Sequence, residues 1–194
     1  MTASPARERP RNATQTRQLL LDVARHRFAR HGYASTTVRE IADGAGVNVA
    51  LINRYFTSKE GLFQACLQTA IIDLKRDTDG IALADVAASI AYRLTSPADD
   101  PALLDALLLL VRSSGDERVD AMRRTVLHSM SERLAVAAGA PQPPDADAVL
   151  RAQIVLAASL GVALMRASVG LQPLASATEA QMRGPISDLV SALT

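Results

Sequence analysis

The stretch that decides the fold is TTVREIADGAGVNVALINRYFTSKEGLF, residues 36–63. Its Ala42, Gly46 and Ile52 stand at relative positions 0, +4 and +10, in two short helical segments that the glycine separates. A small side chain at Ala42 lets one helix cross the other, and glycine adopts the positive φ of a tight turn at low steric cost. This spacing predicts a helix-turn-helix, whose second helix enters the major groove of DNA. An ordinary helical corner has the same spacing, so both interpretations are open at this point.

Start and stop signals divide the first part of the chain into four helices. Capping-box spacing, with Gln or Glu three positions after the cap, occurs at Asn12, Thr37 and Thr57. Asn48 is a favourable cap for a short helix between the last two of these. Gly32 stands where the first helix would end in a left-handed cap. We therefore expect four helices, starting near residues 12, 37, 48 and 57.

Helical patterning continues to the end of the chain, without a competing strand pattern or an internal repeat. Helices are expected over residues 83–95, 101–114, 116–138, 145–170 and 178–193. Asp100 and Thr178 provide N-cap residues for two of these helices. Pro141, Pro143 and Pro144 indicate a linker. The expected fold class is therefore all-α, with about nine helices in total.

The composition limits the classes of protein to consider. The 194 residues are 48% hydrophobic, with a net charge of +1 and a mean hydropathy of +0.10, which suits a folded core and excludes a disordered tail. The longest uncharged apolar run, residues 152–165, is shorter than the about 20 residues that cross a bilayer. The Arg-rich first 30 residues lack the apolar stretch of a secretory signal. Because the one cysteine, Cys66, forbids an internal disulfide, we expect a cytoplasmic protein that does not span a membrane.

Charged and aromatic residues divide the chain into two parts. Residues 1–76 contain 12 Lys and Arg against 6 Asp and Glu, whereas residues 77–194 contain 9 against 14. Five of the six aromatic residues lie in the first part, and only Tyr92 lies in the second. The basic first part favours a polyanionic partner such as double-stranded DNA. The alternative is a helical interaction module whose basic head binds a protein partner.

Residues 36–63 resemble the DNA-binding region of the TetR family of bacterial transcriptional regulators. The matching positions are Gly32-Tyr33, Thr36-Thr37, Ile41-Ala42, Gly46-Val47, Tyr55-Phe56 and Lys59-Glu60-Gly61-Leu62-Phe63. The segment MRASVGLQPLA, residues 165–175, resembles an end-of-helix pattern in one group of the family's C-terminal domains. One position departs from the family, which often has tyrosine where this chain has Asn53. Because asparagine can bind an adenine edge through two hydrogen bonds, we expect this change to alter the base preference.

The resemblance implies a role for individual residues of the helix-turn-helix. Base-edge contacts are expected from Asn48, Val49, Ala50 and Asn53, and phosphate contacts from Thr37, Arg39, Arg54, Tyr55 and Lys59. The structural positions are Ala42, Gly46, Val47 and Ile52. Tyr55 could instead be a core residue beside Phe56, and Arg54 could be a solvated surface charge.

The resemblance also implies a division into domains. Residues 1–13 are expected to be a flexible basic arm, residues 14–58 the helix-turn-helix DNA-binding domain, and residues 59–194 a helical effector-binding and dimerisation domain, which helix 59–80 connects to the head. The helix over 145–170 is apolar nearly all round, so it must be covered on every side. It is either the core helix of a monomer or part of a four-helix bundle between two copies. The interface residues expected for a homodimer are Ala158, Val162, Ile186, Leu189 and Val190.

A small-molecule effector of unknown identity is a further implication of the resemblance. Methionines are adaptable pocket liners, although at helical spacing they are more often core; the expected liners are Met122, Met130 and Met165. With one aromatic ring in this part of the chain, an aliphatic or irregular effector is favoured. Arg112, Arg123 and Arg166 could bind an anionic group, or they could be surface and salt-bridge residues.

The function that this sequence predicts is a dimeric transcriptional repressor, released from a near-palindromic operator by the effector. The chain lacks a glycine-rich phosphate loop, a Gly-x-Ser-x-Gly elbow and clustered metal ligands. We therefore expect neither enzymatic activity nor a cofactor or metal ion.

Overall fold

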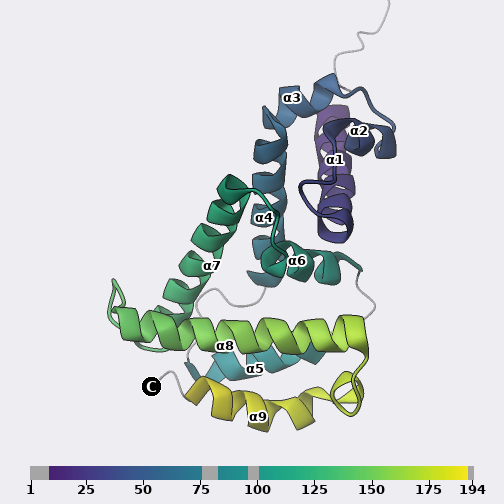
Figure 1. Cartoon of the computed structure of the whole chain (residues 1–194). Coiled ribbons are helices and arrows are strands. Elements are labelled where there is room, and N and C mark those ends of the chain that lie inside the picture. The colour runs from purple at the N-terminus through teal and green to yellow at the C-terminus, as the bar shows by residue number, and fades with distance from the viewer. Residues whose placement is uncertain (1–8, 76–82, 96–100, 192–194) are drawn as a thin grey trace, which may run out of the picture.

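The chain folds into helices throughout the part that the structure describes. The computed structural model describes residues 9–75, 83–95 and 101–191, which contain no strand. Its α-helices are α1 (Arg9–His31), α2 (Val38–Gly44), α3 (Ala50–Phe56), α4 (Lys59–Lys75), α5 (Leu83–Thr95), α6 (Pro101–Val111), α7 (Glu117–Ala137), α8 (Ala146–Leu164) and α9 (Glu179–Ser191). A π-helical turn, η1 (Met165–Val169), and a 3₁₀ turn, η2 (Leu174–Ser176), connect the last two. The all-α expectation, with about nine helices, is confirmed (Figure 1).

A first core cluster joins the N-terminal helices to α6 and α7. In Figure 1, α1, α2 and α3 form a head at one end of α4, and α6 and α7 pack along the rest of that helix. Three rings lie at the centre: Phe28, Tyr33 and Phe63, with ring centroids 5.3 to 5.6 Å apart. Leu109 and Leu110 of α6 are buried in the same cluster. The head therefore shares its core with the helices that follow it.

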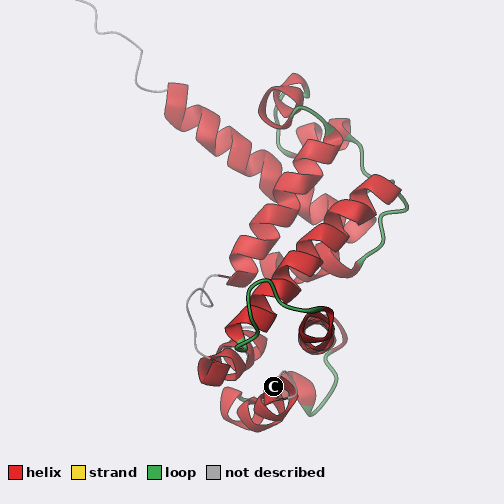
Figure 2. Cartoon of the chain, turned by 90° about the vertical axis from the view of Figure 1, so that its left-hand side faces the viewer, coloured by secondary structure: helices red, strands yellow, loops and turns green. Residues whose placement is uncertain are grey.

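A second core cluster lies between α5, α8 and α9, on the side of α8 away from the head (Figures 1 and 2). It buries Ile186 and Val190 of α9, which are 4% and 3% exposed. These two residues therefore belong to the chain's own core, which corrects their assignment to a dimer interface. Leu189 and Val162 are half-buried against the same cluster. The sequence pattern identified the apolar face of α9, but α5 covers that face.

Two of the expected helix starts differ from the structure. Helix α1 begins at Arg9, so Asn12 lies inside it and does not cap it; residues 1–8 of the expected arm lie outside the described residues. Before α4, the hydroxyl of Ser58, not that of Thr57, accepts a hydrogen bond from the Gly61 N–H, at 3.1 Å. Thr57 has a φ of 68° and forms a γ-turn, in which the Ser58 N–H donates to the Phe56 carbonyl. The turn is needed because α3 ends and α4 begins within three residues.

The other start signals agree with the structure. Thr37 and Glu40 form a complete capping box at α2. Thr178 accepts from the Gln181 N–H, while the Gln181 side chain accepts from the Thr178 N–H. Asp100 lies outside the described residues, as do residues 76–80 of the expected connecting helix. The three prolines lie in the expected loop between α7 and α8.

Helix α8 and η1 form one apolar helical run from residue 146 to 169. By length and composition this run could cross a membrane, with a mean hydropathy of 1.9, and only 17% of its most apolar stretch is buried. It is longer than the uncharged run in the sequence because Arg151 and Arg166 lie within it. A core helix passes the same test, so the length alone is weak support for a membrane span. What it establishes is a large apolar surface that this chain covers only in part.

Candidate nucleic-acid interface

The start of α2 is fixed by reciprocal hydrogen bonds between Thr37 and Glu40. The Glu40 N–H donates to the Thr37 hydroxyl oxygen at 3.2 Å, and the Thr37 N–H donates to the Glu40 carboxylate at 2.7 Å. These bonds hold the pKa of Glu40 below its usual value. Thr37 and Arg39 are both exposed. Two of the predicted phosphate contacts therefore lie on the outer surface at the entrance to α2, where helix N–H groups favour an anion.

The turn between α2 and α3 has the conformation that the sequence predicts. Gly46 has a φ of 65°, and the Val47 N–H donates to the Ala42 carbonyl at 3.0 Å. Ala42 and Ile52 are buried and Val47 is half-buried against the first cluster. The spacing therefore belongs to a helix-turn-helix whose inner face is fully packed.

The outer face of α3 carries the residues predicted to contact bases. Asn48, Ala50 and Asn53 are exposed, and Val49 is 39% exposed. The side-chain oxygen of Asn48 accepts a hydrogen bond from the Ala50 N–H at 2.8 Å. Asn48 therefore stabilises the turn that leads into α3, although the N-cap position itself is Val49, and its amide N–H groups are what it can offer to a base. Asn53, one helical turn further on, has no such local contact among those that the structure describes, so its oxygen and its N–H groups can both face a base edge.

Lys59 stands at the first position of α4, over the ring of Tyr33. Its Nζ atom lies 4.1 Å from the ring centroid, and burial lowers the pKa of the lysine. Burial and a hydrogen bond to Glu60 raise the pKa of Tyr33. The ring holds the ammonium group next to the helix N-terminus, where lysine and helix dipole attract the same anion. Lys59 is thus positioned by packing, not only by its place in the sequence.

Close approach of two backbones sets the angle between α3 and α4. A Cβ atom on Gly61 would lie 2.1 Å from the Phe56 carbonyl oxygen. Only glycine fits there, so Gly61 permits the tight connection that brings Lys59 beside the end of α3. The family resemblance included Gly61, but the sequence alone did not show this contact.

Two predicted phosphate contacts, Arg54 and Tyr55, lie at the C-terminal end of α3, and Arg17 of α1 lies beside them. Arg54 is exposed, and Tyr55 is half-buried, with its ring in edge-to-face contact with Phe56 at 6.4 Å. Tyr55 therefore packs on the core while part of it stays accessible. The guanidinium of Arg17, from α1, lies 5.0 Å from the other ring of this pair, that of Phe56. No local signal could place Arg17 here, because the contact depends on how α1 crosses α3.

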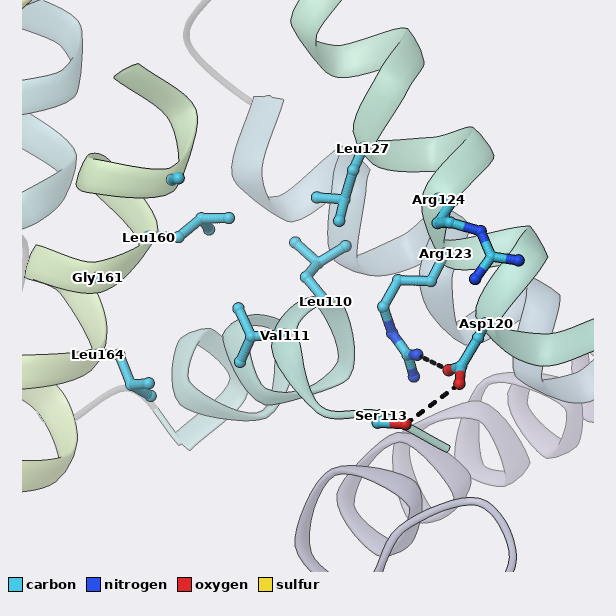
Figure 3. A pocket seen from close by; sticks show the side chains of 11 residues that line it. Leu110, Val111, Ser113, Asp120, Arg123, Arg124, Leu127, Leu160, Gly161 and Leu164 are labelled. Carbon is cyan, nitrogen blue, oxygen red and sulfur yellow. Dashed lines mark hydrogen bonds and ion pairs between the residues drawn. The ribbon is translucent and has the colours of Figure 1, made fainter. Parts of the chain in front are cut away.

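The residues predicted to line an effector pocket do not come together. Met122 and Met130 are half-buried, Met165 is 40% exposed, and none of them lines the hollow between α7 and α8. That hollow consists of two adjoining parts of about 530 and 620 Å³. It is lined by the end of α6, by α7 from Asp120 to Ser131 and by α8 from Gln153 to Leu164, and we call it the α7–α8 trough (Figure 3).

The three arginines considered as anion ligands have structural partners. Arg112 donates to the carbonyls of Ala29 and Arg30 at the end of α1. Arg166 is buried and donates to two carbonyls of the segment before α9. Arg123 pairs with Asp120 and donates to the Leu109 carbonyl at 2.8 Å, at one end of the trough. Arg123 is thus a salt-bridge residue, as the alternative interpretation expected, whereas Arg112 and the buried Arg166 bind backbone carbonyls.

Comparison with known families covers both parts of the chain. A model described as "Bacterial regulatory proteins, tetR family" matches residues 20–66, which contain the helix-turn-helix. A second, described as "Tetracyclin repressor-like, C-terminal domain", matches residues 84–193. The second match alone spans more than half of the chain, so the similarity extends well beyond the head.

Individual regulators are similar over shorter segments. The chain is 30% identical to the HTH-type transcriptional regulator AcrR of Shigella flexneri over 63% of this chain and 53% of AcrR. It is 32% identical to the HTH-type transcriptional repressor ComR of Escherichia coli over 60% of each chain. The matches span less than two thirds of the length of these relatives. A solved structure, the SmeT–triclosan complex, superposes with a TM-score of 0.66 at 22% identity, over 92% of this chain and 90% of that one, which shows a shared fold.

Proposed function

This chain belongs to the TetR family of bacterial regulatory proteins, and on that premise we propose that it is a dimeric repressor released from its operator by a small-molecule effector. The observation that carries the proposal is the outer face of α3, where Asn48, Val49, Ala50 and Asn53 are exposed on a helix whose inner face is locked into the head. A DNA-reading helix needs both properties, because its side chains must reach base edges while its backbone keeps a fixed orientation.

Two kinds of contact are proposed for the DNA complex. Asn53 and the residues that precede it read base edges, with Val49 or Ala50 against a thymine methyl group. Thr37, Arg39, Arg54, Tyr55 and Lys59 contact phosphates on either side of the groove, which fixes the register without reading sequence. The chain would act by binding and not by catalysis, in the cytoplasm where its operator is accessible. A head directed at a protein partner is not favoured, since the matched family is one of DNA-binding regulators.

Two copies are proposed to pair through the outer face of α8. Leu150 and Ile154 are 53% and 58% exposed on that face. Ala158 and Val162, which the sequence assigned to the interface, are half-buried on the same helix. Burying this surface against a second copy would cover the apolar run described above. The two-fold axis would place two α3 helices about one DNA repeat, or a multiple of it, apart, which requires a near-palindromic operator.

Selection of genomic DNA fragments by the purified chain, at near-physiological salt, tests the proposal. A shared inverted repeat among the recovered fragments supports a dimeric sequence-specific regulator. Recovery without any shared site would contradict it, because nonspecific phosphate binding alone gives that result.

Light scattering tests the pairing separately. Ile154→Asp is expected to convert dimers to monomers, whereas Leu19→Asp, at a site on α1 that is 45% exposed, should leave the dimer intact. A dimer that persists in Ile154→Asp would place the interface elsewhere.

A further inference from the structure

The trough between α7 and α8 is a large hollow that the DNA-binding head does not explain. Its middle is apolar: Leu110, Leu127 and Leu160 approach the same space from three different helices, with Gly161 leaving room beside them (Figure 3). The two adjoining parts share Leu127 and Leu160, so they form one elongated hollow. From Gln153 to Leu164 along α8, its length is about 17 Å at 1.5 Å per residue. This shape fits a linear aliphatic chain better than a compact or aromatic molecule.

The polar groups along the trough determine which head group would be accepted. Among the described residues that line it, Asp120 is the one carboxylate, and that carboxylate already accepts hydrogen bonds from Ser113, Ser114 and Arg123. These bonds lower the pKa of Asp120 to about 2, with the Ser114 N–H as the largest cause. The carboxylate is therefore charged, but the adjacent Arg123 guanidinium balances its charge and its Oδ1 atom already accepts three of these bonds, so it attracts a cationic ligand only weakly.

Donors for an anion, in contrast, are available. Arg124 lines both parts of the trough, and its guanidinium is paired with Glu117, which does not line it. The side chains of this pair are 62% and 83% exposed, so the pair contributes little and the guanidinium, which now points away from α8, can turn inward (Figure 3). His128 lines the same trough one helical turn further along α7, where its Nε2 atom lies 3.5 Å from a carboxylate oxygen of Glu132. The Arg124 guanidinium thus stands at the rim of an apolar channel as a group that can receive an anion.

From these observations we infer that the α7–α8 trough binds a linear aliphatic molecule with an anionic, carboxylate-like head group, which Arg124 receives. This inference rests on the proposed function, because it names the class of the effector. The trough also offers a route to the head, since Leu110, Leu127 and Leu160 all belong to or pack on the core cluster that contains Phe28 and Phe63. A ligand that separates α7 from α8 would therefore disturb the packing behind the reading helices.

Calorimetric titration of the full chain with three probes tests the head group. Decanoate, 1-decanol and decyltrimethylammonium share a linear tail and differ in charge. Decanoate is expected to bind about ten-fold more tightly than decanol, because it gains a charge-assisted hydrogen bond, and the ammonium probe should bind most weakly. Decanol binding as tightly as decanoate would overturn the anionic assignment.

Substitution of Arg124 tests the residue. Arg124→Met keeps the aliphatic stem and removes the guanidinium, so decanoate affinity should fall about ten-fold while decanol affinity stays constant. The matched control is Arg118→Met, an exposed position on the same helix that does not line the trough. A decanoate affinity that is the same in Arg124→Met and in the parent would overturn the role of Arg124.

Filling the trough with a larger side chain tests whether the ligand binds there. A Cβ atom at Gly161 meets no atom within 4 Å, so the side chain of Gly161→Leu starts in open space, occupies the trough and should abolish decanoate binding. Ala180→Leu, at an exposed position on α9 that does not line the trough, should not. If Gly161→Leu fails to fold, Ala157→Leu fills the same space and decides the question. Decanoate binding that persists in the variant with the filled trough would overturn the site. A loss of decanoate binding that occurs only when the oligomeric state also changes would overturn it too.

DNA binding is measured separately, so that the two proposals can fail independently. Decanoate that binds at the trough without weakening DNA binding would leave the ligand class standing and contradict the effector role. Normal operator recognition without any decanoate binding would overturn the ligand inference alone.

Discussion

The Nδ1 atom of His26, in α1, lies 2.9 Å from a carboxylate oxygen of Asp105, in α6. Arg30 donates to the other oxygen at 3.0 Å, so the buried carboxylate, in a residue 4% exposed, joins two successive turns of α1. Arg112, just after α6, donates to the carbonyls at the end of α1. Asp105 in α6 and Arg112 just after it therefore both bind α1, the first helix of the head, while Leu110 of α6 lines the trough. The head and the proposed ligand site are connected by one short helix.

Neutralising Asp105 should weaken this contact between α6 and α1. Asp105→Asn keeps the shape but leaves Arg30 facing an uncharged amide, so we expect a loss of about 1–3 kcal/mol in the free energy of unfolding. Urea denaturation measures it. Asp43→Asn, at an exposed position on α2, should change the free energy by less than about 0.5 kcal/mol. Equal stability of the two variants would mean that the contact of Asp105 with His26 and Arg30 does not stabilise the fold.

The close contact at Gly61 gives a second prediction. Gly61→Ala places a methyl group against the Phe56 carbonyl, so α3 and α4 must move apart, at a cost of about 1–3 kcal/mol. The head should unfold at a lower temperature, and DNA affinity should fall with it, because Lys59 moves relative to α3. Gly161→Ala, inside α8 at a position where a Cβ atom meets nothing within 4 Å, should instead stabilise the chain by about 0.5–1 kcal/mol. A melting curve for each variant, recorded by circular dichroism, separates the two outcomes.

Local signals in the sequence were sufficient where all partners lie within one helical turn. The boxes at Thr37 and Thr178 could be predicted because cap, N–H donor and returning side chain are three residues apart. The prediction that Thr57 caps α4 was wrong. Its neighbour Ser58 carries the same hydroxyl group, and only the path of the chain from α3 to α4 decides which of the two accepts the Gly61 N–H.

Contacts between distant segments could not be predicted in this way. Apolar spacing identified the face that holds Ile186 and Val190 but not the helix that covers it. His26 and Asp105 are 79 residues apart, and no pattern in either helix indicates the other. The prediction of the pocket residues failed for the same reason. Methionine suggests adaptable packing, whereas the trough is formed by leucines of three helices that meet only in the fold.

Acid should destabilise the chain through Asp120. Its folded-state pKa of about 2 lies below the usual 3.8, so the unfolded chain binds more protons between these values. The stability that this carboxylate contributes is therefore complete above about pH 4 and is lost as the pH falls toward 2. Urea unfolding across this range should show a steeper loss for the parent than for Asp120→Asn. Asp188→Asn, exposed on α9, should follow the parent, and parallel curves for the parent and Asp120→Asn would contradict the assignment.

Lys59 and Asn53 should differ in how their loss changes DNA binding. Lys59→Ala removes one proposed phosphate contact, so it should weaken binding to every duplex alike and lower the salt slope by about one. Asn53→Ala removes a proposed base contact from the exposed face of α3, so it should cost about 1–3 kcal/mol on the preferred site and relax the choice of base there. Binding isotherms at several salt concentrations, on the selected operator and on a scrambled duplex, measure both effects. Because Lys59 is held over Tyr33 at the start of α4 whereas Asn53 projects from α3, identical behaviour of the two variants would show that positioning and reading are not divided between these helices.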